Sequence, residues 1–298
     1  MMQKYDTIII GSGIAGMTAA IYLKRGGLNP LIIEEGAPGG QLNKITTIEN
    51  YPGFVKTDGP SLAKDIYDQV ENLHIEYLFD KVISTELSEK EKVITTLNNK
   101  LTCDYLIIAT GRLSKKLNKD DEKYAGKGIS YCALCDGALY KGKEVAVVGG
   151  GNSALEEALY LSDICKKVTL IHRSDSFRGD QALINDVLNK KNIKCVYNSN
   201  ITEYNIENGV LASLSLDSGD KIDASGLFIS IGSVPSAEVF DVNKEKGFII
   251  VDEECMTNIE NVYACGDVIK KSVYQLTTAA SEGTVVAYSI IKKNKKTK

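Results

Sequence analysis

The 298-residue chain contains only five prolines, two histidines and no tryptophan. None of its apolar runs is long enough to span a bilayer. A tetrahedral zinc site needs four ligands, and one close cysteine pair with two distant histidines, His74 and His172, does not supply them. Lys and Arg number 35 against 39 Asp and Glu, a net charge of −4 without a basic stripe, which argues against nucleic acid. The N-terminus also lacks the pattern of a signal peptide. We therefore expect a cytoplasmic protein that binds no metal, membrane or nucleic acid.

The seven cysteines do not resemble a set of structural disulfides, because such bonds are rare in a reducing compartment. Only Cys132 and Cys135 form a close pair, and Asp136 follows them directly. A Cys-x-x-Cys pair can have a lowered thiol pKa, and a neighbouring carboxyl group can move the proton that thiol–disulfide exchange requires. The pattern predicts a redox pair, with these three residues as catalytic candidates. The alternative role for Asp136 is to cap a helix or turn.

The N-terminal segment has the pattern of a dinucleotide-binding unit. Thr7–Ile10 is a short apolar run typical of a buried parallel strand, Met17–Lys24 is expected to be a helix, and a second strand, Pro30–Ile33, leads into Glu34. Between strand and helix, glycines at G-x-G-x-x-G spacing allow a tight turn and the close approach of a pyrophosphate, and the acid can bind a ribose hydroxyl. The candidate cofactor residues are Gly11, Gly13, Gly16 and Glu34.

The same pattern recurs in the middle of the chain, with a strand at Glu144–Val148, a helix at Ser153–Leu161 and a second strand at Val168–Ile171. Here cationic side chains, not an acid, follow the second strand. Cations at this place suit a 2′-phosphate, which indicates NADP rather than NAD. The candidate residues of this second site are Gly149, Gly151, Asn152, Ser153, Ala154, His172, Arg173 and Arg178.

Two such units indicate an α/β protein with two Rossmann-like dinucleotide-binding domains. Strands that end in small-residue turns, at Leu106–Arg112 and Leu227–Ser236, are expected to be the two crossings between them. The second domain, residues 114–241, would then be inserted into the first, which comprises residues 1–113 and 242–298. In the returning segment a strand ends at Gly266 and Asp267, where an acid can bind a ribityl hydroxyl, and the N-terminus of the last helix can face a ring carbonyl.

Seven motifs follow one another in a specific order: GSGIAG, PGGQL, ENYPGF, ATG, CALCDG, GGGNSALEEALYL and CGDV. With this order and spacing the chain resembles the bacterial low-molecular-weight thioredoxin reductases from end to end. The resemblance implies FAD in the first and last segments, NADPH in the middle, a homodimer, and transfer of electrons through a Cys132–Cys135 disulfide to thioredoxin. It implies further FAD-binding residues: Ala15, Gly40, Gln41, Asn50, Thr110, Gly111 and Gln275. It also implies that Cys135 faces the flavin and that Cys132 attacks thioredoxin. Asp136 is implied to protonate or deprotonate the leaving thiol.

Two positions depart from the family pattern. Ser174 replaces the second arginine of His-Arg-Arg-x-x-x-Arg, and Tyr274 stands where an arginine commonly precedes the glutamine. Loss of a charge-assisted hydrogen bond, about 1.5–3 kcal/mol, would weaken phosphate binding. Reduced ferredoxin is therefore an alternative electron donor, as in a clostridial and cyanobacterial branch of similar enzymes. A nucleotide-binding redox sensor is less favoured, because it would need neither the acid nor a complete flavin framework.

Overall fold

The computed structural model describes residues 3–45 and 48–297. The chain divides into two compact units, residues 1–113 with 234–298 and residues 114–233, so the second unit is inserted into the first. The second boundary precedes the expected one at residue 241, because Ala237, Phe240 and Val242 are buried in a hydrophobic core of the first unit. The connecting strands β7 (Arg112–Ser114) and β16 (Ser233–Pro235) pair with each other.

The first unit contains a sheet with the strand order β3-β2-β1-β6-β5-β4, in which β19 also pairs with β6. The strands β1, β2, β3, β6 and β19 are mutually parallel, whereas β4, β5 and β6 form an antiparallel meander. Residues on both faces of the central strands, such as Ile8 and Ile9, are fully buried, as expected of continuous apolar strands. The strands are β1 (Gln3–Ile10), β2 (Pro30–Glu34), β3 (Glu76–Phe79), β4 (Val82–Leu87), β5 (Lys92–Thr96), β6 (Lys100–Ile108) and β19 (Val262–Ala264).

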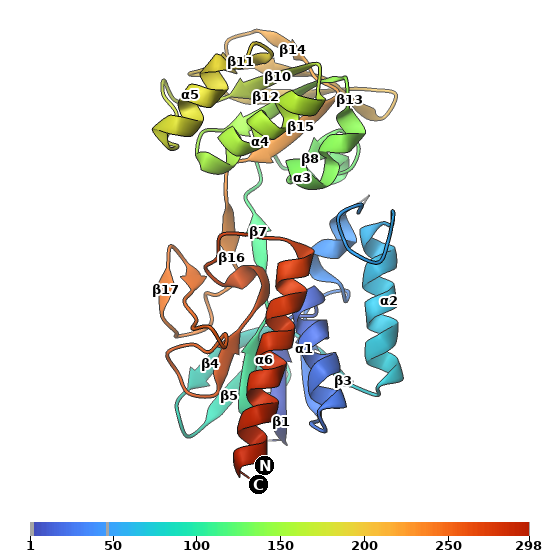
Figure 1. Cartoon of the computed structure of the whole chain (residues 1–298), viewed down its shortest axis with the longest axis vertical. Helices are drawn as coiled ribbons and strands as arrows, with labels where there is room; N and C mark the ends of the chain where they lie inside the picture. Colours follow the sequence, from blue (N-terminus) through green and yellow to red (C-terminus); the bar gives the residue numbers. More distant parts are fainter. Residues whose placement is uncertain (1–2, 46–47, 298) are drawn as a thin grey trace. The chain divides into compact units, whose positions relative to one another are not determined.

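Three helices cover one face of this sheet: α1 (Ile14–Arg25), α2 (Gly59–Asn72) and α6 (Leu276–Thr297). Figure 1 shows α6 alongside α1. Their close approach depends on Gly283, where an added Cβ would lie 2.3 Å from the carbonyl oxygen of Ala15. The other face is covered by residues that follow β16, including the hairpin of β17 (Lys244–Glu245) and β18 (Phe248–Ile249). The 3-10 helices η1 (Gly40–Lys44) and η4 (Gly266–Val268) complete the unit.

The second unit has three layers. Its central sheet is parallel, with the strand order β11-β10-β9-β15-β8. Helices cover one face, and an antiparallel sheet, β12-β13-β14, covers the other. The elements are η2 (Glu122–Tyr124), β8 (Ile129–Ser130), α3 (Ala133–Asp136), η3 (Gly137–Tyr140), β9 (Glu144–Gly149), α4 (Asn152–Ile164), β10 (Lys167–Ile171), α5 (Gln181–Asn189), β11 (Ile193–Val196), β12 (Ile201–Glu207), β13 (Val210–Leu216), β14 (Lys221–Asp223) and β15 (Gly226–Ser230).

The predicted α/β class is confirmed, and the strands and helices predicted around both glycine turns are present with ends that differ by a few residues. Helix α1 begins at Ile14 instead of Met17, directly after the N-cap Gly13. Helix α4 likewise begins at Asn152 instead of Ser153. None of the helices in the described part of the chain combines the length and apolarity that a membrane crossing requires.

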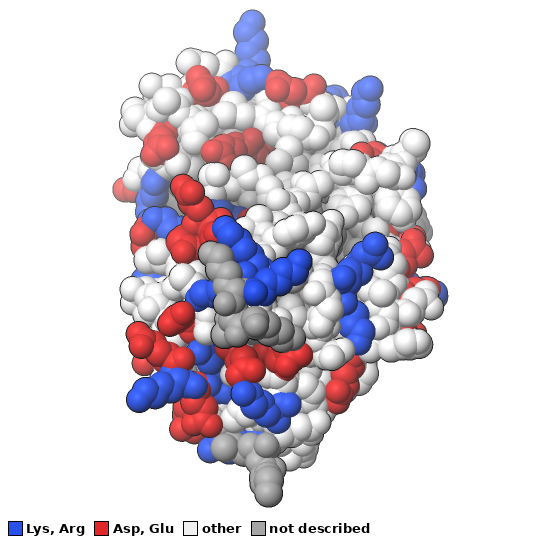
Figure 2. Space-filling model, turned by 60° about the horizontal axis from the view of Figure 1, so that its bottom comes forward, with Lys and Arg blue, Asp and Glu red and all other residues white. Residues whose placement is uncertain are grey.

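Charged side chains of both signs lie interspersed on the face shown in Figure 2. Many of the exposed charges of the protein form ion pairs, for example Lys4 with Asp104 at 2.7 Å and Lys100 with Glu86 at 3.4 Å. Exposed pairs of this kind contribute little to stability. They do, however, prevent the build-up of a strong field of one sign on the surface that they cover.

Candidate active site

The two paired cysteines form a disulfide at the start of α3 in the second unit. Cys132 and Cys135 have Cα atoms 5.3 Å apart, and both are half-buried. The Sγ of Cys132 accepts a hydrogen bond from the backbone N–H of Cys135 at 3.2 Å, a donor that would also stabilise a thiolate at Cys132. Leu134, between the cysteines, exposes 56% of its surface. The disulfide therefore lies next to an exposed apolar side chain.

Asp136 lies beside this disulfide in a largely apolar environment. Its Oδ2 accepts a hydrogen bond from Ser130 Oγ at 2.7 Å, while Oδ1 is buried and without a hydrogen-bond partner among the described residues. Burial raises the pKa of Asp136, and the bond from Ser130 opposes this rise. The carboxylate does not cap α3, because the N-cap is Cys132. Asp136 is the N-cap residue of η3, but its side chain makes no capping hydrogen bond there.

A second buried aspartate, Asp121, supports the segment that carries the disulfide. It is fully buried and accepts four hydrogen bonds, from the backbone N–H groups of Leu117 and Asn118 and from the hydroxyls of Tyr131 and Tyr204, at 2.6–3.1 Å. Tyr131 immediately precedes Cys132. Sequence reasoning missed both Ser130 and Asp121, since Asp121 lies in a polar stretch that has the composition of a solvated loop.

The other five cysteines are unpaired: Cys103, Cys165, Cys195, Cys255 and Cys265. Burial raises the pKa of the thiols, to about 12 for Cys103 and Cys255 and to about 11 for Cys165. Because the thiolate is the reactive form of cysteine, these side chains are poor nucleophiles.

The first glycine turn is as close-packed as the motif requires. Gly11 has φ +103°, and an added Cβ would lie 2.4 Å from the carbonyl oxygen of Ala109; at Gly16 it would lie 2.1 Å from the carbonyl oxygen of Gly11. At Gly13 the added atom would meet nothing within 4 Å, so this side of the turn is open. Glu34 accepts hydrogen bonds from the backbone N–H of Ser12 at 2.7 Å and from that of Gly36 at 2.9 Å, which places its carboxylate at the turn.

Further residues predicted to bind FAD lie at the carboxyl end of the same sheet. Gly40 faces Gly13, because a Cβ on Gly40 would lie 3.4 Å from the Cα of Gly13. Asn50 Nδ2 donates a hydrogen bond to Gln275 Oε1 at 3.3 Å, and Gln275 directly precedes α6. The remaining residues of this set follow strand ends or begin α1: Ala15, Gln41, Thr110, Gly111, Gly266 and Asp267. In parallel sheets, ligands bind at this edge.

The second glycine turn is covered by His172. A Cβ on Gly149 would lie 2.3 Å from the carbonyl oxygen of Ser230, and one on Gly150 would lie 2.1 Å from Cε1 of His172. His172 is buried, and its Nε2 has no hydrogen-bond partner among the described residues. Burial, together with the charge of Arg178, lowers the pKa of His172. The imidazole is thereby held against the turn in its neutral form.

The loop after β10 folds back onto the start of α4. Asn152 and Asp180 exchange two hydrogen bonds of 2.8 Å, and the backbone N–H of Arg178 donates to the carbonyl oxygen of Gly150 at 2.7 Å. Arg173 and Arg178 are exposed, whereas Ser174 is half-buried. Gly151, Ser153 and Ala154 complete the turn and the first turn of α4. The structure thus brings the loop that carries the two predicted cations into contact with the glycine turn.

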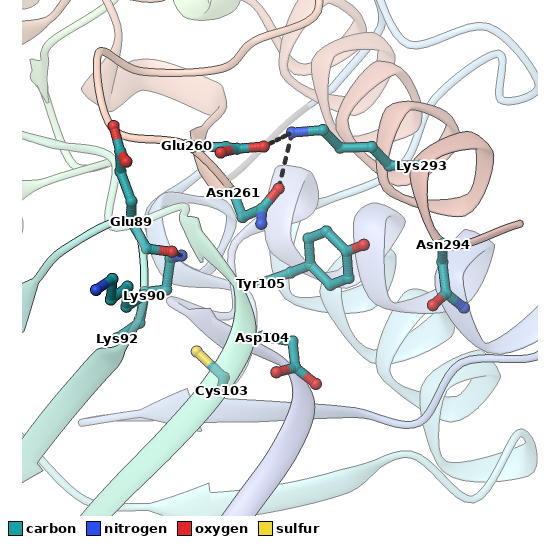
Figure 3. Close-up of a pocket in the computed structure, with 10 residues that line it drawn as sticks. All are labelled: Glu89, Lys90, Lys92, Cys103, Asp104, Tyr105, Glu260, Asn261, Lys293 and Asn294. Atoms are coloured by element: carbon teal, nitrogen blue, oxygen red, sulfur yellow. Dashed lines mark hydrogen bonds and ion pairs between the residues drawn. The ribbon is translucent and has the colours of Figure 1, made fainter. Parts of the chain in front are cut away.

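A pocket of about 480 Å³ in the first unit lies elsewhere. Figure 3 shows that it is lined from β5, β6, the segment before β19, and α6. Two of its cations have partners: Lys293 contacts Glu260 and Asn261, and the buried Lys92 donates to the carbonyl oxygen of Glu89. Cys103–Tyr105 line it from the middle of β6, before the carboxyl end of the sheet. It is therefore separate from the predicted cofactor residues.

Two dinucleotide-binding folds with a disulfide beside the second define a class of flavin- and nicotinamide-linked disulfide oxidoreductases. A family model described as pyridine nucleotide-disulphide oxidoreductase matches residues 5–283, and the chain belongs to this family and, within it, to the low-molecular-weight thioredoxin reductases.

Three known proteins illustrate the relationship. The thioredoxin reductase of Bacillus subtilis is 36% identical over 295 residues, which cover 96% of this chain and 93% of that protein. The crystal structure of thioredoxin reductase from Streptococcus pyogenes is 35% identical with a TM-score of 0.93, covering 99% of this chain and 100% of that one. A ferredoxin-flavin thioredoxin reductase from Clostridium acetobutylicum is 29% identical with a TM-score of 0.56, covering 99% and 100%.

Proposed function

We propose that the protein is an FAD-dependent thioredoxin reductase that passes electrons from NADPH, through FAD and the Cys132–Cys135 disulfide, to oxidised thioredoxin. One observation carries this proposal: the disulfide and the half-buried Asp136, whose pKa is raised by burial, lie on the same unit as the second glycine turn. The location we infer is the cytoplasm, where the five unpaired cysteines would stay reduced.

The first unit is proposed to hold FAD and the second NADPH. In the first, Gly13 leaves open space at the turn, and Asp267 Oδ1 is buried without a hydrogen-bond partner among the described residues, although Lys271 Nζ lies 3.3 Å away. Both features fit a dinucleotide whose pyrophosphate and ribityl hydroxyls would fill these places. When bound, FAD would take a hydride from the nicotinamide and pass two electrons to the disulfide.

The side chains of the second unit then carry out the thiol–disulfide exchange. Two electrons and two protons convert the Cys132–Cys135 disulfide into a dithiol. The Cys132 thiolate attacks the disulfide of thioredoxin, forming a mixed disulfide and releasing one thioredoxin thiolate. Cys135 attacks Cys132 Sγ, which restores the original disulfide and releases the second thiolate. Asp136 can accept the proton of the attacking thiol or give one to the leaving group.

Turnover with thioredoxin tests this proposal. We expect NADPH oxidation that depends on oxidised thioredoxin, and a loss of at least about 1,000-fold in Cys132→Ser and in Cys135→Ser. Cys195→Ser is the matched control, because Cys195 is a half-buried, unpaired cysteine of the same unit, and it should retain activity. Wild-type turnover in either active-site variant would contradict the roles of the two cysteines.

Reduced ferredoxin is a second candidate donor, favoured by Ser174 in place of an arginine on the loop that would hold the 2′-phosphate. The similarity to a ferredoxin-flavin thioredoxin reductase supports it, although the proteins named thioredoxin reductase above are more similar. Anaerobic titration of the flavin with NADPH, NADH and reduced ferredoxin separates the two. Bleaching by micromolar NADPH would exclude the ferredoxin hypothesis, whereas bleaching by ferredoxin alone would exclude NADPH.

A homodimer is also proposed, as the resemblance implies. Exposed apolar side chains of the first unit support it, including Tyr22 and Tyr288, whose rings lie 5.9 Å apart. Sedimentation at micromolar concentration should give twice the mass of the chain, and a single-chain mass at all concentrations would contradict this.

A further inference from the structure

The most unusual feature around the predicted FAD residues is a cation, Arg112, held by three contacts. Its Nε lies 3.3 Å from Oδ2 of Asp267. The carbon of its guanidinium group lies 4.3 Å from the centroid of the Tyr274 ring. Its carbonyl oxygen accepts a hydrogen bond from Nε2 of Gln41 at 3.0 Å. Arg112 therefore contacts two residues predicted to bind FAD and the residue that precedes a third, Gln275.

Arg112 differs from the other cation of this cluster, Lys271. The side chain of Lys271 is 10% exposed, and its Nζ lies 2.9 Å from Glu282 and 3.3 Å from Asp267. Its charge is therefore shared between two carboxylates in the interior of the unit. The side chain of Arg112 is 33% exposed, so its charge lies at the accessible edge of the cluster.

The residue that packs against the charge of Arg112 is aromatic. Arg112 packs its guanidinium against the ring of Tyr274. Planar guanidinium groups stack well on aromatic faces. The tyrosine and the arginine together act as one unit, in which the ring fixes the position of the charge.

We propose that Arg112 is a positive charge at the edge of the FAD site that raises the reduction potential of the flavin. This rests on the proposed function, since it requires that FAD binds the first unit. The oxidised isoalloxazine ring is neutral, and uptake of two electrons and one proton leaves it with one negative charge. A neighbouring cation stabilises the negative form more than the neutral one. Arg112 therefore acts through its charge alone and takes up no proton or electron itself.

The test is the midpoint potential of the bound flavin, measured against a reference dye during slow anaerobic reduction. It is made in a Cys132→Ser, Cys135→Ser background, so that the flavin alone takes up electrons. Arg112→Met should shift the equilibrium at least tenfold toward the oxidised flavin, which is about 30 mV for a two-electron couple. Arg112→Lys should retain most of the potential. Adding Tyr274→Arg to Arg112→Met should restore it, because the charge returns at the neighbouring position.

The matched control is Lys270→Met, which removes an exposed cation that pairs with Glu245 at 2.6 Å, outside the cluster. It should leave the potential unchanged. If Arg112→Met fails to retain FAD, Tyr274→Leu replaces it, because that variant keeps the charge and removes the ring that fixes it; a smaller shift of the same sign is expected. If the variant has the same midpoint potential as the Cys132→Ser, Cys135→Ser background protein, the proposal is overturned. A protein with Arg112 intact that takes up no FAD would instead refute the proposed function.

Discussion

Removal of the Ser130 hydroxyl tests how a single hydrogen bond affects the pKa of Asp136. Ser130 Oγ donates the one hydrogen bond that Asp136 receives among the described residues, at 2.7 Å to Oδ2. That bond stabilises the ionised carboxylate and opposes the upward shift that burial imposes on the pKa of Asp136. In Ser130→Ala the carboxyl group stays buried without this donor, so its pKa should rise further.

The size of the effect follows from the kind of bond. A hydrogen bond to a charged group contributes about 1.5–3 kcal/mol, and a free-energy difference of 1.36 kcal/mol corresponds to one pH unit. The limb of the pH–rate profile that reports Asp136 should therefore move up by about 1 to 2 pH units. The direction is the same whether the reaction needs the protonated or the ionised carboxyl group, because either limb follows the same pKa.

The assay mixes pre-reduced enzyme with oxidised thioredoxin in a stopped-flow instrument between pH 5 and 9.5, so that disulfide exchange is observed before product release. Ser130→Thr, which keeps a hydroxyl, should retain the wild-type profile. Ser162→Ala is the matched control, because Ser162 is a buried serine of the same unit whose hydroxyl donates to the carbonyl oxygen of Leu159. An unchanged profile in Ser130→Ala would refute the role of this hydrogen bond.

Three further predictions concern stability and binding. Asp136→Asn should raise Tm at pH 7–8, because a raised pKa of Asp136 means that its ionisation costs folded-state stability. The difference in Tm should disappear as the pH falls and the wild-type carboxyl group becomes protonated; equal Tm values at all pH would contradict this. Ser174→Arg should lower the KM for NADPH about tenfold and leave that for NADH unchanged. Gly13→Ala should keep the Tm of the FAD-free protein, because the added Cβ meets nothing within 4 Å, yet weaken FAD binding at least about tenfold; undiminished FAD affinity would refute the assignment of the turn.

The parts of the fold that sequence predicts are those governed by local physical constraints. The apolar runs around Ile8–Ile10 and Val145–Val148 predict buried parallel strands, and both are present. The turn at Gly11 is predictable because its φ of +103° and the nearby carbonyl of Ala109 allow no side chain. The second boundary between the units was less predictable. Phe240 is buried in the core of the first unit by residues that lie far from it in the sequence.

The parts that sequence does not predict are contacts between distant residues. Arg112 stacks on Tyr274 and pairs with Asp267, although more than a hundred residues separate them. Nothing local to Arg112 distinguishes it from the lysines that follow it in a polar segment. The departure at Tyr274 was visible in the sequence, but its consequence depends on which side chain the fold brings to that ring.

Two aspartates near the disulfide show how environment assigns different roles to the same side chain. Asp121 accepts four hydrogen bonds from two backbone N–H groups and two tyrosine hydroxyls, and so ties the segment before the redox pair to β12. Asp136 has a single donor and a buried oxygen that none of the described residues satisfies. A group that can gain or lose a proton without breaking its surroundings is the one suited to acid–base work, and the fold places it directly after Cys135.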